Sequence, residues 1–326
     1  MENLPVWKRE AWPNRASREL SLRARKATFK AFPALLSQNW KIWLRSLFFG
    51  LLFLFGPTLG SSSCFAYLHF RAALVMDDNT GKIIYCKNSN LRLPPASTTK
   101  LMTAILVLEK AELSKVVTIS KRAVQVEPVK IGFKEGDKLR VEDLLYAVLL
   151  KSANDAAVAL AETVAGTEKN FVELMNKKAY FLDLKNTKFI NATGLPGPGQ
   201  YTTAADLSKL MSYALEFPKI REIMETPEAK ISTAEGKVFF LRTTNRLLES
   251  PEKVIGKTGF TQRAKHCFVG ALKKGTKNIV FAILGSENRK NLWLEAKRLT
   301  ISGYGKQGRR AKDYLGRQKY SLSLKS

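Results

Sequence analysis

A lysine stands at the start of a segment that has the pattern of a buried helix, and this combination limits the folds open to the chain. Between Leu101 and Leu108 apolar residues recur at helical spacing, and Leu106 and Val107 add a second apolar side. A helix that is apolar on most sides packs inside a protein. Because a buried charge is costly, Lys100 needs specific partners or a specific task. The chain must therefore enclose this helix, with its lysine, in a substantial core.

Strand patterns stand at both ends of the region around this helix. A hairpin is predicted over residues 73–86, with Asn79 and Gly81 in its turn. The remaining predicted strands cover residues 254–261, 266–273 and 278–285, and the predicted helices cover residues 97–110, 141–165, 168–182, 203–216 and 291–303. Short connections favour antiparallel pairing. We therefore predict an α/β chain of the α+β type, with an antiparallel sheet completed by both ends, covered by helices and carrying an inserted all-helical lobe.

Three short polar motifs occur in this framework. Each has an ordinary structural explanation by itself: a capped helix start for the first two, and an edge strand with a glycine bulge for the third. Their occurrence together, in this order, indicates one site assembled from distant parts of the chain. The motifs are Ser97-Thr98-Thr99-Lys100, Ser152-Ala153-Asn154 and Lys257-Thr258-Gly259.

The first motif has the spacing of an activated nucleophile. Ser97 and Lys100 are three residues apart on one helix, so their side chains project from the same face. A serine hydroxyl is a weak nucleophile unless a neighbour takes its proton, and a lysine can take it only when neutral. Burial and a nearby positive charge, for which Lys257 is the candidate, would lower the pKa of Lys100. Free N–H groups at the helix start favour an oxyanion near Ser97.

The other two motifs supply groups that bind and relay. We expect Ser152 to relay a proton and Asn154 to bind a substrate amide and to orient Lys100. We expect Lys257 and Thr258 to bind a substrate carboxylate. Gly259 would let the backbone approach the ligand closely, and the N–H of Phe260 would complete an oxyanion hole opposite the Ser97 N–H.

The N-terminal part has the order of an export signal. A basic segment over residues 1–45 precedes an apolar run over residues 47–55, and small residues follow up to Ala66. The apolar run is shorter than the roughly 20 residues of a comfortable membrane span. We expect residues 46–66 to be a signal peptide cleaved after Ala66, or an uncleaved membrane anchor. Either would place a domain of residues 67–304 in the periplasm or on the outer face of the cytoplasmic membrane.

The net charge of +26 suggests an anionic partner. No nucleic-acid-binding motif accompanies the charge, so we expect no nucleic acid to bind. An exported protein that faces anionic lipid or wall polymer explains the charge as well, and so does a solvated surface without a specific partner. The basic tail of residues 305–326 is expected to be disordered, with electrostatic membrane association as the alternative.

Cysteine and histidine usage gives no sign of a metal or a cofactor. Cys86 and Cys267 fall in predicted strands, and we expect both to be buried free thiols rather than a disulfide. His69 and His266 are the two histidines of the sequence, and no phosphate-binding loop is present. We therefore expect no metal and no cofactor.

Residues from about 72 to 304 resemble the low-molecular-mass penicillin-binding proteins, the D-alanyl-D-alanine carboxypeptidase family. The resemblance covers the three motifs with their neighbours over residues 95–104, 152–157 and 257–267, and a loop over residues 184–195. It implies a β-lactamase/transpeptidase-like fold and an acyl-enzyme mechanism. In that mechanism Ser97 attacks the bond between two D-alanines of a peptidoglycan stem peptide, D-Ala leaves, and water hydrolyses the ester. It also implies inhibition by β-lactams, which acylate the same serine.

Alternatives remain within this resemblance. A class A β-lactamase needs a glutamate after the second motif, and none lies between Glu173 and Glu216. A D,D-endopeptidase, which cuts cross-links, is the closer alternative. Relatives often carry a β-rich C-terminal domain. Because 22 residues follow Tyr304, we expect no such domain here. Single-domain members of the family include endopeptidases, which favours this alternative. Lys265, where the family usually has glycine, is expected to alter substrate preference.

Overall fold

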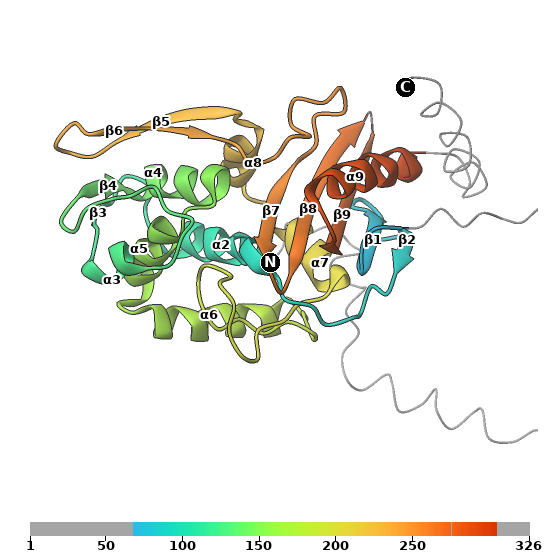
Figure 1. Ribbon diagram of the computed structural model, residues 1–326, viewed down its shortest axis with the longest axis horizontal. Helices are drawn as coiled ribbons and strands as arrows, with labels where there is room; N and C mark the ends of the chain where they lie inside the picture. Colours follow the sequence, from blue (N-terminus) through green and yellow to red (C-terminus); the bar gives the residue numbers. More distant parts are fainter. Residues whose placement is uncertain (1–67, 275, 305–326) are drawn as a thin grey trace, which may run out of the picture. The chain divides into compact units, whose positions relative to one another are not determined.

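The computed structural model describes residues 68–274 and 276–304, and it contains the predicted antiparallel sheet (Figure 1). Five strands pair antiparallel in the order β2-β1-β9-β8-β7. Strands from both ends of the described chain therefore lie side by side, as the sequence predicted. The strands are β1 (Ala72–Asp77), β2 (Ile83–Lys87), β7 (Ile255–Thr261), β8 (Lys265–Lys274) and β9 (Lys277–Ser286).

Both faces of this sheet are covered. Helix α9 (Arg289–Tyr304) lies across one face, where Trp293 packs edge-on against Phe268 with their ring centroids 5.3 Å apart. Helices α2 (Lys100–Lys110) and α7 (Ala204–Ala214) lie on the opposite side. The central strand β9 is consequently buried from residue 279 to residue 286, which explains its uninterrupted apolar sequence.

Helix α2 lies among the other helices of the lobe, and it is buried, as its sequence predicted. Every residue from Lys100 to Val107 is buried. The 3₁₀ turn η2 (Ala96–Thr99) leads into it. The helices around it are α3 (Lys121–Gln125), α4 (Val141–Tyr146), α5 (Asn154–Ala165) and α6 (Glu168–Phe181).

Several elements were not predicted from the sequence. They are the short helix α3, the strand pair β3 (Val116–Thr118) and β4 (Lys138–Arg140), helix α8 (Pro218–Glu225), and the hairpin of β5 (Glu228–Ser232) and β6 (Val238–Arg242). The strands are short, so an apolar period has little room to show in them. Helix α8 does have such a period, with Ile220, Ile223 and Met224 buried at helical spacing, and this signal could have predicted it. The helix predicted over residues 141–165 is interrupted by a π-helical turn, η3 (Ala147–Lys151), and by Ser152 in the left-handed conformation.

The expectation for the thiols was half wrong. Cys86 and Cys267 are both free, and Cys267 is buried, but Cys86 is exposed because β2 is an edge strand. Within the described residues no helix is long and apolar enough to cross a membrane. The N-terminal basic segment, the signal or anchor of residues 46–66 and the basic tail lie outside those residues.

We predict that Lys265→Gly stabilises the protein. Lys265 follows the turn between β7 and β8 and has φ +58°, a left-handed conformation that costs a side-chain-bearing residue about 1–2 kcal/mol. Glycine adopts it freely but loses more entropy on folding, so we expect the free energy of unfolding in urea to rise by about 0.5–1 kcal/mol. Lys265→Ala is the control, since it removes the same charge at the same φ. Equal stability of the two variants would contradict this account.

Candidate active site

The amine of Lys100 is the point at which the distant segments of the site meet. Its Nζ lies 3.3 Å from Ser97 Oγ, 2.6 Å from Asn154 Oδ1 and 2.6 Å from the carbonyl oxygen of Thr193. The side chain is completely buried. The predicted nucleophile, the predicted base and the predicted orienting amide are thus in direct contact.

The surroundings of Lys100 favour its neutral form. Burial lowers the pKa of Lys100 well below its ordinary value, and the positive charge of Lys257 lowers it further. The carboxylate of Asp155 acts in the opposite direction. A neutral amine within hydrogen-bonding distance of Ser97 Oγ can accept the hydroxyl proton. The local environment therefore agrees with the predicted role of Lys100 as a general base.

The turn that carries Ser97 is enclosed by two glycines from other segments. A Cβ at Gly194 would lie 1.9 Å from the carbonyl oxygen of Ala96, and a Cβ at Gly259 would lie 3.0 Å from the backbone nitrogen of Ser97. Gly194 also has φ +83°. The sequence predicted that Gly259 permits a close backbone approach; here the approach is to the turn of the nucleophile itself.

The second motif does not cap a helix. Ala153, without a capping side chain, precedes α5, and Ser152 has φ +65°. This conformation places Ser152 Oγ 3.0 Å from Lys257 Nζ, which donates a hydrogen bond to it. The backbone nitrogen of Asn154 donates to the carbonyl oxygen of Val129, and its Nδ2 donates to the carbonyl oxygen of Glu127. Asn154 Oδ1 is therefore left to face Lys100.

The third motif lies on β7, the edge strand of the sheet beside the lobe. Lys257 is fully buried, and burial lowers its pKa to about 7. The hydroxyl groups of Thr258 and Thr244 lie 2.6 Å apart, so Thr244 holds the side chain of Thr258. Phe260 is exposed at the end of the strand, and its ring centroid lies 4.4 Å from that of His266. The oxyanion role of the Phe260 N–H and the relay role of Ser152 stay predictions.

Sequence reasoning missed Thr193, Thr244 and Asp155. Thr193 contributes a carbonyl oxygen, which leaves no trace in residue type, and Thr244 acts through another threonine. Asp155 was given no role of its own, although an acid inside an alanine-rich buried helix was a signal that could have found it. Among the described residues, no group of three or more His, Cys, Asp or Glu side chains is placed to hold a metal ion.

Known proteins are similar to this chain in sequence. Residues 63–288 match the model of the D-alanyl-D-alanine carboxypeptidase family, which confirms the predicted resemblance. The chain is 38% identical over 226 residues to D-alanyl-D-alanine carboxypeptidase DacF of Bacillus subtilis, a match that covers 68% of this chain and 58% of DacF. It is 33% identical over 243 residues to a D-alanyl-D-alanine endopeptidase of Pseudomonas aeruginosa, and that match covers 70% of this chain and 78% of the relative. The chain thus spans less than two thirds of the length of DacF.

A solved structure shows the same fold. The crystal structure of the Streptomyces K15 DD-transpeptidase superposes with a TM-score of 0.69 and 32% sequence identity. The superposition covers 73% of this chain and 98% of the transpeptidase. This likeness confirms the predicted transpeptidase-type fold.

We predict a bell-shaped pH dependence for acylation of Ser97 by a peptide substrate that bears a terminal carboxylate. The neutral form of Lys100 is needed, and its lowered pKa lets the rate rise with pH far below the pKa of about 10.4 of a free lysine. The charged form of Lys257 is needed for the carboxylate, and it is lost above a pKa of about 7 in the free enzyme. The measurement is kcat/KM against pH. A substrate without the carboxylate should keep the rising limb and lose the falling one; a steady rise to about pH 10 with both substrates would contradict the assignment.

Proposed function

The chain belongs to the D-alanyl-D-alanine carboxypeptidase family, and from that premise we propose that it is a serine-type carboxypeptidase that removes the terminal D-Ala from peptidoglycan stem peptides. The observation that carries the proposal is the buried amine of Lys100, which lies 3.3 Å from Ser97 Oγ and is oriented by two oxygen acceptors. This geometry supports a covalent mechanism on serine.

In the acylation step, Ser97 Oγ attacks the carbonyl carbon of the penultimate D-Ala. The hydroxyl proton passes to Lys100 Nζ as the C–O bond forms, and the tetrahedral oxyanion is stabilised by the N–H groups of Ser97 and Phe260. The C–N bond then breaks, and the proton held by Lys100 passes through Ser152 to the leaving amine of D-Ala, which leaves Lys100 neutral again; Ser152 Oγ is 3.0 Å from Lys257 Nζ. In deacylation, Lys100 takes a proton from a water as the water oxygen attacks the ester carbonyl carbon. It returns that proton to Ser97 Oγ as the ester C–O bond breaks.

Substrate binding would use the other groups of the third motif. The ammonium of Lys257 and the hydroxyl of Thr258 are suited to a terminal carboxylate, because a charge-assisted hydrogen bond to a carboxylate is strong in a buried site. A bound carboxylate would also raise the pKa of Lys257 and keep it charged during turnover. β-Lactams carry a carboxylate next to an activated amide. We therefore propose that they bind at the same groups, acylate Ser97 and inhibit the enzyme.

Cleavage of peptidoglycan cross-links is the second candidate activity. It is favoured by the match to the Pseudomonas aeruginosa endopeptidase, which covers 78% of that relative against 58% of DacF. Both activities would use the same acyl-enzyme on Ser97, and they differ in which D-Ala bond is cut.

We also propose that the enzyme is exported and acts in the periplasm or on the outer face of the cytoplasmic membrane. The proposal is supported by the order of basic, apolar and small residues up to Ala66. Association with the membrane, through residues 46–66 or the basic tail, belongs to the same proposal.

A labelled penicillin tests the nucleophile. We expect the wild-type protein to be labelled covalently, and Ser97→Ala to lose the label while it keeps the melting temperature. We further expect slow hydrolysis of nitrocefin, because no glutamate lies between Glu173 and Glu216 to activate a deacylating water. Equal labelling of both proteins would overturn the assignment of Ser97. Rapid nitrocefin turnover would favour a β-lactamase.

Muropeptides test the substrate. The purified chain is incubated with monomeric and cross-linked muropeptides, with Ser97→Ala as the control, and the products are weighed by mass spectrometry. Loss of one alanine from pentapeptide monomers is the result expected for a carboxypeptidase. Conversion of cross-linked dimers to monomers would show the endopeptidase instead.

A further inference from the structure

A buried carboxylate next to the second motif neither transfers a proton nor contacts a reacting group in the mechanism described above. Asp155 is completely buried in the first turn of α5. Its carboxylate accepts hydrogen bonds from the backbone nitrogen of Ile131 at 2.9 Å and from that of Gly132 at 3.0 Å. It also accepts one from the nitrogen of Ala156 at 2.9 Å. Asp155 thus ties α5 to the segment of residues 126–137, which we call the α3–β4 loop.

The same loop holds the side chain of Asn154. The carbonyl oxygen of Glu127 accepts from Asn154 Nδ2 at 2.9 Å, and the carbonyl oxygen of Val129 accepts from the Asn154 backbone nitrogen at 2.7 Å. These bonds fix which end of the amide faces Lys100, because Nδ2 is already occupied. The loop therefore fixes the position and the orientation of the Asn154 side chain.

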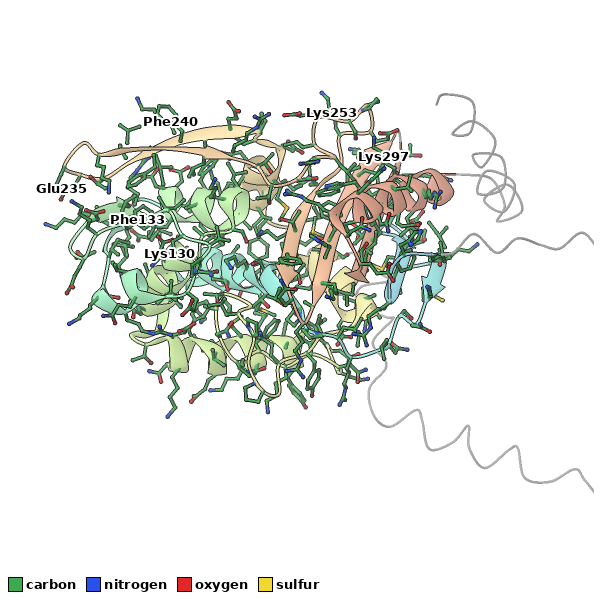
Figure 2. The ribbon with its side chains drawn as sticks, in the orientation of Figure 1. Lys130, Phe133, Glu235, Phe240, Lys253 and Lys297 are labelled. Atoms are coloured by element: carbon green, nitrogen blue, oxygen red, sulfur yellow. The ribbon has the colours of Figure 1, made fainter. Side chains whose placement is uncertain are left out.

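Packing fixes the far end of this loop. Phe133 is buried and meets Phe239 of β6 edge-on, with ring centroids 5.2 Å apart. Figure 2 shows Phe133 and Lys130 on the loop beneath the β5–β6 hairpin, whereas Phe240 points away from it on the outer side. The middle of the loop, at Ile131 and Gly132, is held against α5 by its hydrogen bonds to Asp155.

We propose that Asp155 is a positioning residue of this active site: its buried carboxylate anchors the α3–β4 loop, and the loop in turn holds Asn154 against the amine of Lys100. The inference rests on the proposed function, since it concerns acylation of Ser97. Asp155 touches neither the nucleophile nor the leaving group, and it acts through the loop and through its charge.

The charge of Asp155 has a measurable effect on the pKa of Lys100, which a purely structural residue would not have. Lys100 is acted on by Lys257 from β7, which lowers its pKa, and by Asp155 from α5, which raises it. Ser97, Asn154 and Thr193 contribute neutral groups. If Asp155 is neutralised with its shape kept, the pKa of Lys100 falls further. If the site were merely loosened, water would reach Lys100 and its pKa would rise.

The experiment measures the second-order rate constant for labelling of Ser97 by a fluorescent penicillin between about pH 5 and pH 9. We expect Asp155→Asn to label about tenfold more slowly than the wild type on the pH plateau, because a small displacement of catalytic groups costs about that much or more. We also expect the rising limb of the pH profile of Asp155→Asn to move to lower pH, because the pKa of Lys100 falls. Hydrogen exchange of a peptide covering residues 126–137 should become faster.

Two further variants distinguish the effect of Asp155 on the loop from the effect of its charge on Lys100. Gly132→Ala keeps the Asp155 charge but strains the loop, since Gly132 has φ +89° with open space around an added Cβ. It should label more slowly without a shift of the limb to lower pH. Asp143→Asn is the matched control: it removes a buried carboxylate from the same helical lobe, and that carboxylate pairs with Arg140. It should keep the wild-type rate and profile.

The outcomes are distinct. A folded Asp155→Asn that labels at the wild-type rate, or whose rising limb stays in place or moves to higher pH, would overturn the inference. If Asp155→Asn does not fold, a wild-type rate in Gly132→Ala overturns it instead. A wild-type protein that takes up no label would overturn the proposed function, and this inference with it.

Discussion

The arrangement of the site depends on the hydrogen bonds of one buried amine. Lys100 Nζ contacts groups from three segments that lie far apart in sequence, namely the η2 turn with Ser97, helix α5 with Asn154 and the loop with Thr193. An amine without such partners could not remain in the core, because a buried polar group is costly when it is unsatisfied. The same contacts that make burial of Lys100 tolerable also point it at Ser97.

Small residues and special backbone conformations let these segments come close enough. Gly194 and Gly259 approach the backbone of the η2 turn: a Cβ at Gly194 would collide with it, and a Cβ at Gly259 would be in tighter contact than is usual. Ser152 takes the left-handed conformation between η3 and α5, and so its hydroxyl reaches Lys257 rather than the end of a helix. The site thus contains unfavourable backbone conformations that the surrounding core holds in place.

Sequence reasoning predicted those parts of the fold that have a strong apolar period. Helix α2 and strand β9 are buried on most sides, and their sequences are correspondingly apolar. The β5–β6 hairpin was missed because its strands are short and β6 has apolar residues, Val238 and Phe240, at exposed positions, so its sequence does not alternate clearly. Cys86 was expected to be buried because a strand was predicted there, but whether a strand lies at the edge of a sheet is decided by pairing far along the chain.

The residue types and their spacing by themselves indicated that Ser97 and Lys100 lie close together at the start of a buried helix, and they made Lys257 the candidate for a positive charge nearby. A side chain with a distinctive chemistry is visible in a sequence. Only the tertiary structure decided that the carbonyl oxygen of Thr193 completes the surroundings of Lys100, and that Asp155 holds the loop behind Asn154. Backbone groups are the same in every residue, so their placement follows from how the chain packs.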